Sequence, residues 1–318
     1  MGLFAVFECG MLRLRCHVID TLEAVGGQCT ALYPEKPIYD IPGFPTLEAA
    51  ELITRLEQQA APFAPHYHLG QQVTGLRRLS DEGGGWQVTT SAGTRIDASA
   101  VVIAGGCGAF GPNRPPLEGL ECYEGRSVHY LITRKADFAG KRVVIAGGGD
   151  SAVDWALSLA EVAAHVYVIH RRNKFRAAPE SISRLRALAA ASPQVELVIP
   201  YQLHGLEGEA GTLHTVQVAS LQGEVRRLPA DVLLPFFGLA MTLGPIAQWG
   251  LQLERNHITV DPATLATSQP GIYAIGDIAS YPEKLKLILC GFSEAAMAAH
   301  AIYHYLYPES VLHLEHST

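Results

Sequence analysis

The stretch from Lys141 to Arg176 constrains the fold most, because it has the pattern of one complete β-α-β unit. Arg142–Ala146 is a short apolar run rich in β-branched residues, which is typical of a buried parallel strand. The segment 150–164 is rich in Ala and Leu and predicts a helix, and His165–Ile169 predicts a second strand. Parallel strands joined by a crossover helix belong to α/β proteins, so the sequence predicts that class.

The turn between the first strand and the helix matches the G-x-G-x-x-G/A fingerprint at Gly147, Gly149 and Ala152. The first small residue allows a tight turn, the second lets a pyrophosphate approach the backbone, and the third lets the helix pack closely on the strand. The next helical residues, Asp150 and Ser151, start the helix whose N–H groups would face the phosphates. The turn therefore predicts dinucleotide binding, although a purely structural glycine turn is the alternative.

Basic residues follow the second strand and indicate which dinucleotide binds. An NAD site usually has Asp or Glu at this point to bind the ribose 2′-hydroxyl. This chain has His170, Arg171, Arg172 and then Arg176. Guanidinium groups suit a 2′-phosphate, so we expect NADP(H), with an ordinary solvated basic loop as the alternative.

Composition excludes several classes of protein. The chain has 318 residues, enough for two domains, and its 48% hydrophobic and 17% charged content suits a cytoplasmic α/β protein with large cores. The net charge of −7 argues against nucleic acid as a partner. The sequence shows neither an apolar run long enough to span a membrane nor the features of a signal peptide. None of the six cysteines forms C-x-x-C, so we expect reduced thiols, no metal site and no local dithiol.

The first residues resemble the second half of another dinucleotide unit. Met1–Gly10 predicts a helix and Arg15–Asp20 a strand that ends in an acid. Gly2 would be the last fingerprint glycine and Asp20 would bind a ribose hydroxyl, with an ordinary helix–strand pair as the alternative. Further along, we expect helices at 47–59 and 292–305, a small antiparallel meander within 72–96, buried strands at 99–104, 231–236 and 271–275, and more strands at 195–199, 203–206 and 215–220.

Several stretches carry a family pattern, namely GLFAVFECGM, GGQCTALYPEKPIYDIPGFP, KRVVIAGGGDSAVDWA, HRRNKFRA, GIYAIGDIASY, GFSEAA and the terminal HST. The sequence resembles the thioredoxin-reductase-like ferredoxin–NADP⁺ reductases, which are flavoproteins with two nucleotide-binding domains, over nearly its whole length. This resemblance implies an α/β fold with two Rossmann-like, three-layer ββα domains. A discontinuous FAD domain would comprise 1–112 and 236–318, and an NADP(H) domain at 113–235 would be inserted in it.

The resemblance also implies where FAD would bind. Tyr33 would stack on one face of the flavin, and His316 would cover the other face, from its own subunit or from the partner in a homodimer. Core packing is the alternative for Tyr33, and an ordinary chain terminus is the alternative for His316. The other FAD contacts implied by the resemblance are Gly2, Asp20, Gly27, Gln28, Val73, Phe110, Asp277 and Ser317.

The implied activity is hydride transfer between NADP(H) and FAD, with single electrons passing between the flavin and ferredoxin or flavodoxin. No side chain is required as a catalytic acid or base. Thioredoxin reductases carry a C-x-x-C just before the NADP fingerprint, whereas this chain has GRSVHYLITRKADFAGKR there. Disulfide reduction therefore lacks a local dithiol. The alternatives are an NADPH-dependent disulfide or quinone reductase of the same fold, and a flavin-free NADP(H)-binding protein.

The start of the chain departs from the family pattern. The family has a first strand and G-x-G-P-x-G, of which only Gly2 is present here. From this we expect that the chain is truncated or that its start was assigned too late. A central parallel strand and a pyrophosphate loop would then be lacking, so we expect FAD to bind weakly or not at all.

Overall fold

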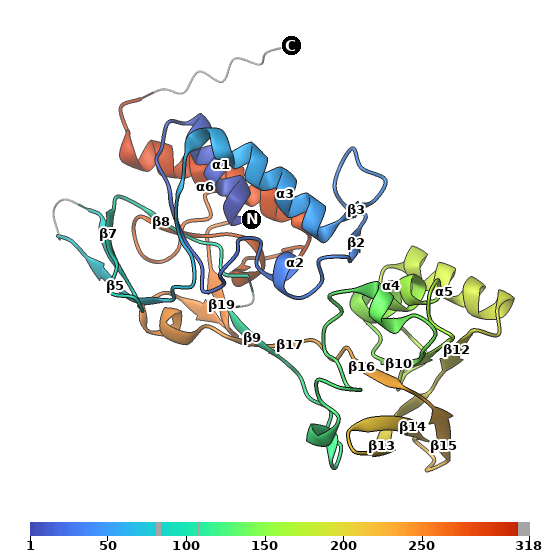
Figure 1. Cartoon of the computed structure of the whole chain (residues 1–318). Coiled ribbons are helices and arrows are strands. Elements are labelled where there is room, and N and C mark those ends of the chain that lie inside the picture. The colour runs from blue at the N-terminus through green and yellow to red at the C-terminus, as the bar shows by residue number, and fades with distance from the viewer. Residues whose placement is uncertain (81–83, 107, 311–318) are drawn as a thin grey trace. The chain divides into compact units, whose positions relative to one another are not determined.

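The computed structural model describes residues 1–80, 84–106 and 108–310, and these form two compact units (Figure 1). The first unit comprises Met1–Ala31, Ile38–Phe110 and Met241–Thr318, and the second comprises Leu32–Pro37 and Gly111–Ala240. The first unit is therefore discontinuous in sequence, with most of the second inserted in it. Leu32–Pro37 differs from the predicted division, because this segment belongs to the second unit.

The second unit is built on a four-stranded parallel sheet in the order β12-β11-β10-β16. These strands are β10 (Arg142–Ala146), β11 (His165–Ile169), β12 (Val195–Val198) and β16 (Val232–Pro235). The predicted β-α-β unit is confirmed, with α4 (Asp150–Leu159) between β10 and β11. The helix ends before residue 164 because the chain turns there, and the Ala164 N–H donates to the carbonyl of Lys141 at 2.9 Å.

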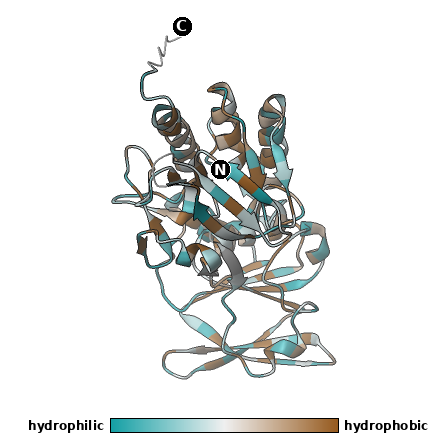
Figure 2. Ribbon diagram, turned by 90° about the vertical axis from the view of Figure 1, so that its left-hand side faces the viewer, coloured by the Kyte–Doolittle hydropathy of each residue, from teal (hydrophilic) through white to brown (hydrophobic). Residues whose placement is uncertain are grey.

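Two further layers cover this parallel sheet. The helices α4 and α5 (Pro179–Ala191) pack on one face, where Val143 and Ile145 of β10 are buried. An antiparallel sheet of β13 (Tyr201–Glu209), β14 (Thr212–Ser220) and β15 (Val225–Pro229) packs on the other face, where Val144 and Ala146 are buried. Successive strand residues point to opposite faces, so a strand covered on both sides must be continuously apolar. Figure 2 shows hydrophobic and hydrophilic residues alternating along the antiparallel strands, which are covered on one face. The sequence analysis did not predict α5 or β15.

Helices of the first unit pack around its N-terminal helix. The helix α1 (Gly2–Met11) contacts both α3 (Ala49–Ala60) and α6 (Ile288–Leu306), which confirms the predicted helices (Figure 1). The ring centroids of Phe4 and Phe292 lie 4.9 Å apart, so α1 and α6 share an aromatic contact.

Two parallel strand pairs and an antiparallel meander complete the first unit. The parallel pairs are β1 (His17–Ile19) with β4 (His66–His68), and β8 (Val101–Ile103) with β20 (Ile272–Ala274). In the described part of the chain these pairs are separate two-stranded sheets. The predicted meander is confirmed as β5 (Val73–Arg78), β6 (Trp86–Thr90) and β7 (Arg95–Ala98). Together the two units give the predicted α/β fold with two Rossmann-like domains.

The remaining elements are short. The helix α2 (Gln28–Ala31) follows the glycine pair 26–27. The other strands are β2 (Pro37–Ile38), β3 (Leu47–Glu48), β9 (Ala109–Pro112), β17 (Leu239–Thr242), β18 (Leu253–Glu254), β19 (His257–Thr259) and β21 (Ala279–Ser280). The 3₁₀ helices are η1 (Ala61–Phe63), η2 (Leu120–Cys122), η3 (Lys135–Phe138), η4 (Gly244–Gln248) and η5 (Gly276–Ile278).

Candidate dinucleotide-binding sites

The glycine turn of the second unit is sterically closed at its first position. The Gly147 N–H donates to the carbonyl of Ile169 at 3.0 Å, which ties the turn to β11. A Cβ at Gly147 would lie 2.7 Å from the carbonyl oxygen of Phe236 and 3.0 Å from the Cβ of Ala152. Ala152 is fully buried at this contact. The turn and the helix therefore approach as closely as they do only because both positions are small.

The turn is open at Gly149, the second fingerprint position. No atom lies within 4 Å of a Cβ built at Gly149, and this residue is the N-cap of α4 without any side-chain cap. An anion could therefore approach both the backbone and the helix N-terminus here. Ser151 is exposed in the first turn, whereas Asp150 Oδ1 accepts a hydrogen bond of 2.9 Å from the Ala178 N–H. The Asp150 carboxylate thus links the start of α4 to the segment before α5.

The basic loop after β11, which carries the three arginines and is also called the arginine loop, folds back onto this turn. The Arg176 N–H donates to the carbonyl of Gly148 at 2.7 Å, and a Cβ at Gly148 would lie 2.3 Å from Cε1 of His170. Arg171, Arg172 and Arg176 are all exposed. The fold thus brings together the fingerprint and the basic residues that were predicted to bind the same nucleotide. The sequence analysis missed the contact at Gly148, because this residue is the unspecified second position of the fingerprint.

His170 lies beneath the loop. Its side chain is buried, its ring stacks on Phe175 with 5.2 Å between centroids, and Nε2 lies 3.2 Å from the carbonyl of Lys174. Burial lowers the pKa of His170, and the charge of Arg176 acts in the same direction, while the bond to the Lys174 carbonyl opposes them. A neutral ring that donates from Nε2 suits this geometry. These contacts give His170 the role of ordering the arginine loop, and its predicted contact with NADP stays a prediction.

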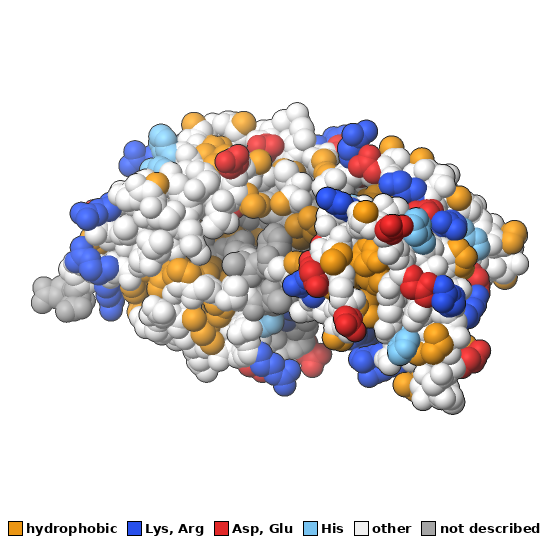
Figure 3. All heavy atoms as spheres, turned by 60° about the horizontal axis from the view of Figure 1, so that its bottom comes forward, with side chains coloured by type: hydrophobic (Ala, Val, Ile, Leu, Met, Phe, Trp, Pro, Cys, Tyr) orange, Lys and Arg blue, Asp and Glu red, His pale blue; other side chains and the backbone are white. Residues whose placement is uncertain are grey.

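A groove of about 800 Å³ lies between the basic loop and α5. Its lining includes the cationic side chains Lys174, Arg176 and Arg186, and no Asp or Glu. On the face drawn in Figure 3, Lys and Arg lie among Asp and Glu over the right-hand part of the surface. An acid-free groove with three cations is therefore a suitable place for a phosphate group. Arg186 was missed from the sequence because α5, which carries it, was not predicted.

Predicted FAD residues of the first unit lie at the carboxyl ends of its parallel strands. Asp20 follows β1 and Asp277 follows β20, and a Cβ at Gly2 would lie 3.7 Å from Cβ of Ala104, which follows β8. The side chain of Met1 lies against Gly276, so the start of α1 is next to the turn that carries Asp277. In open α/β sheets, ligands bind at this edge.

A buried carboxylate holds the turn between β20 and η5. Glu294 is 2% exposed, accepts hydrogen bonds of 2.7 Å from the Gly276 N–H and the Tyr281 hydroxyl, and forms an ion pair with Lys284. Burial and the bond to Glu294 raise the pKa of Tyr281. The neighbouring Asp277 is thereby held in position. Sequence analysis placed Glu294 in the GFSEAA motif and gave it no role.

The other predicted FAD residues of the first unit lie in different local surroundings. Asp20 Oδ1 accepts a 3.0 Å hydrogen bond from the Leu22 N–H, and burial raises the pKa of Asp20 against the effect of the backbone bonds. Gly27 has φ +58° with no atom within 4 Å of a built Cβ. A Cβ at Gly106 would lie 3.7 Å from Nε2 of Gln28, the first residue of α2. Val73 begins β5.

Four predicted FAD contacts are left untested by the described part of the structure. Tyr33 belongs to the second unit, where it packs against the core on the helix side of the sheet and where Lys36 Nζ lies 5.6 Å from its ring centroid. Phe110 lies in β9, and its side chain is outside the described part of the structure. His316 and Ser317 lie outside the described residues. Flavin stacking by Tyr33 and His316 stays a prediction.

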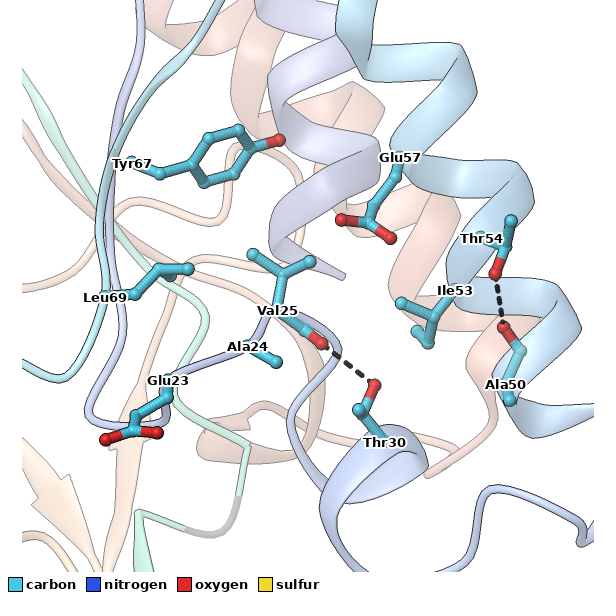
Figure 4. A pocket seen from close by; sticks show the side chains of 10 residues that line it. All are labelled: Glu23, Ala24, Val25, Thr30, Ala50, Ile53, Thr54, Glu57, Tyr67 and Leu69. Atoms are coloured by element: carbon cyan, nitrogen blue, oxygen red, sulfur yellow. Dashed lines mark hydrogen bonds between the residues drawn. The ribbon is translucent and has the colours of Figure 1, made fainter.

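A separate pocket of about 440 Å³ lies among the loop after β1, α2, α3 and β4 (Figure 4). Its lining includes the carboxylates Glu23 and Glu57 and no Lys or Arg, so it is unsuited to a phosphate. Thr30 Oγ1 donates to the Val25 carbonyl at 2.9 Å across one side of the pocket. None of the predicted site residues lines it.

Neither a metal centre nor a membrane span is found where the structure describes the chain. Residues 1–80, 84–106 and 108–310 contain no group of three His, Cys, Asp or Glu side chains placed to bind a metal. Within the same ranges, every helix is too short or too polar to cross a bilayer.

Sequence comparison identifies relatives over the full length. The family model described as pyridine nucleotide-disulphide oxidoreductase matches residues 45–300. The ferredoxin–NADP reductase of Paramagnetospirillum magneticum is 65% identical over 100% of this chain and 94% of that protein. The protein of the same name from Rhodospirillum rubrum is 61% identical, over 100% of this chain and 92% of that protein.

Structure comparison identifies the same architecture in thioredoxin reductases. The thioredoxin reductase of T. acidophilum has a TM-score of 0.82 at 22% identity, covering 95% of this chain and 94% of that one. The Lactococcus lactis enzyme has a TM-score of 0.81 at 22% identity, covering 96% and 95%. At this identity the likeness shows the fold alone.

Proposed function

Because this chain belongs to the pyridine nucleotide-disulphide oxidoreductase family, we propose that it uses FAD to transfer electrons between NADP(H) and ferredoxin or flavodoxin. Full-length identity of 65% and 61% to proteins named ferredoxin–NADP reductase supports this activity over others on the same fold. The resemblance further suggests a homodimer.

The observation that carries the NADP(H) assignment is the contact between the glycine turn and the arginine loop. The Arg176 N–H bonds to the Gly148 carbonyl, while Gly149 stays open in front of the N-terminus of α4. A pyrophosphate at Gly149 would therefore lie close to a loop with three exposed arginines. Charge-assisted hydrogen bonds from such groups would favour the 2′-phosphate of NADP(H).

The residues of the first unit fit FAD at the edge where β1, β8 and β20 end. Gly2 and Gly27 offer close backbone approach, Asp20 and Asp277 offer acceptors for hydroxyl groups, and Gln28 borders the same edge. The flavin, when bound, would supply the exchange of a hydride for single electrons. The protein would hold the rings and exclude water, and no acid–base pair is assigned.

The distribution of cysteines favours ferredoxin over a disulfide as the acceptor. Cys122 is the only cysteine in the sequence of the second unit, so this unit has no dithiol beside the NADP fingerprint. A disulfide reductase that works through a dithiol there would lack its reacting pair.

Steady-state kinetics tests the proposal. FAD-saturated protein should oxidise NADPH much faster with ferredoxin than with oxidised thioredoxin or a small disulfide, and faster with NADPH than with NADH. Equal or faster turnover with the disulfides would favour the disulfide reductase instead.

A further inference from the structure

Two cysteines that lie seven residues apart in the sequence meet in the first unit. Cys9 is in the last turns of α1, and Cys16 immediately precedes β1. The two thiol groups interact, and this interaction is the largest cause of the shift in the pKa of each. Cys9 is 7% exposed, whereas Cys16 is partly accessible to solvent. Their spacing does not match C-x-x-C, so the sequence analysis did not predict this contact.

The backbone of the α1–β1 connection holds the pair together. The helix ends at Met11, and Arg13 has φ +58°, which turns the chain back toward the helix. The Leu14 N–H then donates to the carbonyl of Cys9 at 2.8 Å. The Cys16 thiol lies 3.9 Å from the carbonyl oxygen of Leu14. Both cysteines are thus fixed to Leu14, and their proximity does not depend on a flexible terminus.

The two thiols differ in reactivity. The interaction with the Cys16 thiol, together with burial, raises the pKa of Cys9. The same interaction lowers the pKa of Cys16, against the effect of its partial burial. Since the thiolate is the reactive form, the more accessible Cys16 is the better nucleophile, and the buried Cys9 lies next to it.

We propose that Cys9 and Cys16 form a redox-active dithiol, which a low-molecular-weight disulfide oxidises to an intramolecular disulfide. The Cys16 thiolate attacks one sulfur of the added disulfide, so that a mixed disulfide forms and one thiolate leaves. Cys9 then releases its proton to solvent and attacks the Cys16 sulfur, and the second thiolate leaves. The two cysteines lose two electrons, and the added disulfide is reduced to two thiols.

The Cys9–Cys16 disulfide would lie within the part of the first unit that carries two predicted FAD residues. It would join the end of α1, which begins at Gly2, to the start of β1, which leads to Asp20. Oxidation would therefore fix the spacing between these two elements. This inference rests on the local contacts of α1 and β1 and is independent of the proposed electron-transfer activity.

Peptide mapping after mild oxidation tests the proposal. Folded protein carrying Cys29→Ser would be incubated with oxidised glutathione, alkylated and digested with trypsin. Cleavage after Arg13 and Arg15 separates Cys9 from Cys16, and the serine at position 29 removes the other cysteine from the second peptide. We expect a disulfide between the two peptides that dithiothreitol reverses.

Single variants separate the two roles. Cys9→Ser should accumulate one glutathione on Cys16, whereas Cys16→Ser should leave Cys9 unmodified. Cys122→Ser, which changes an exposed cysteine of the other unit, should leave the yield of the Cys9–Cys16 bond unchanged. The proposal is overturned if glutathione stays on Cys16 in the protein with both cysteines. It is equally overturned if Cys9 links to Cys122 or Cys290 as often as to Cys16.

Discussion

The carboxylate of Glu294 accepts a hydrogen bond of 2.7 Å from the backbone N–H of Gly276. This bond ties α6 to the turn that follows β20, so a helix near the end of the chain holds the segment carrying Asp277. The same carboxylate bonds to the Tyr281 hydroxyl and pairs with Lys284, whose side chain is 7% exposed. One buried acid therefore organises three groups at the candidate FAD edge.

Replacing this acid should destabilise the first unit. Glu294→Ala leaves the Lys284 charge and the Gly276 N–H buried without their carboxylate partner, which should cost about 3–5 kcal/mol of unfolding free energy. The matched control is Glu161→Ala, because Glu161 pairs with Lys135 while its side chain is 71% exposed. Such a pair should contribute at most about 1 kcal/mol. Urea unfolding of both variants measures the difference, and equal losses would contradict the role given to Glu294.

The glycine turn offers a second test, in which adjacent substitutions should affect different properties. Gly148→Ala places a methyl group 2.3 Å from the His170 ring and should lower the unfolding free energy of the second unit by about 1–3 kcal/mol. Gly149→Ala meets no protein atom and should cost less than about 1 kcal/mol, mainly by weakening the N-cap.

Gly149→Ala should weaken NADPH binding strongly although it changes the unfolding free energy little. Its new methyl group would occupy the space where a pyrophosphate approaches, so the Kd for NADPH should rise at least tenfold although the protein stays folded. Isothermal titration calorimetry, run beside denaturant unfolding, measures both properties. Unchanged NADPH affinity in folded Gly149→Ala protein would mean that the nucleotide binds elsewhere.

Nucleotide preference should depend on the arginine loop. Charge-assisted hydrogen bonds contribute about 1.5–3 kcal/mol each, so Arg171→Ala/Arg172→Ala should raise the KM for NADPH at least tenfold. The KM for NADH should change little, since NADH lacks the 2′-phosphate. Arg227→Ala is the control, because Arg227 is an exposed arginine of β15 that pairs with Glu207. An unaltered KM for NADPH in the double variant would defeat the assignment.

Low pH should destabilise the arginine loop, because it protonates His170. Its pKa is lowered in the folded protein, so protons bind the unfolded chain more readily. The stability contributed by the neutral ring is fully present above about pH 6.5 and is lost as pH falls through the lower folded pKa. His170→Gln keeps a donor for the Lys174 carbonyl but does not titrate. The parent should therefore lose more unfolding free energy than this variant between about pH 7.5 and pH 5, and parallel losses would contradict the prediction.

Local chemistry explains why the NADP unit could be predicted from the sequence. The strands at 142–146 and 165–169 have the predicted bounds, because a strand buried on both faces must be continuously apolar. The fingerprint then places Gly147, Gly149 and Ala152 at the turn, and the arginine loop follows within a few residues. Every one of these signals lies within one short stretch.

Other features could not be predicted, because they depend on contacts between distant segments. In the sequence, Glu294 is an acid in an Ala-rich helix, and its contacts with Gly276 and Lys284 are formed only in the folded protein. Cys9 and Cys16 showed no known spacing, and their meeting depends on the turn at Arg13. The family resemblance placed Tyr33 in the FAD domain, whereas its segment packs with the second unit.

The helix α5 was missed for a different reason. Pro179 at its start and an Ala-rich second half are local helix signals, but its buried face is narrow, with Leu185 its fully buried residue. The apolar periodicity that usually reveals a helix is therefore weak there.

Anaerobic reduction of the bound flavin tests the central claim most directly. NADPH would be added to FAD-saturated protein while the visible flavin absorption is recorded, and oxidised ferredoxin would follow. The account predicts that NADPH bleaches the flavin and that ferredoxin restores its absorption. Oxidised thioredoxin, added in place of ferredoxin, should leave the flavin reduced. A flavin that NADPH does not bleach, or that thioredoxin but not ferredoxin reoxidises, would contradict the account.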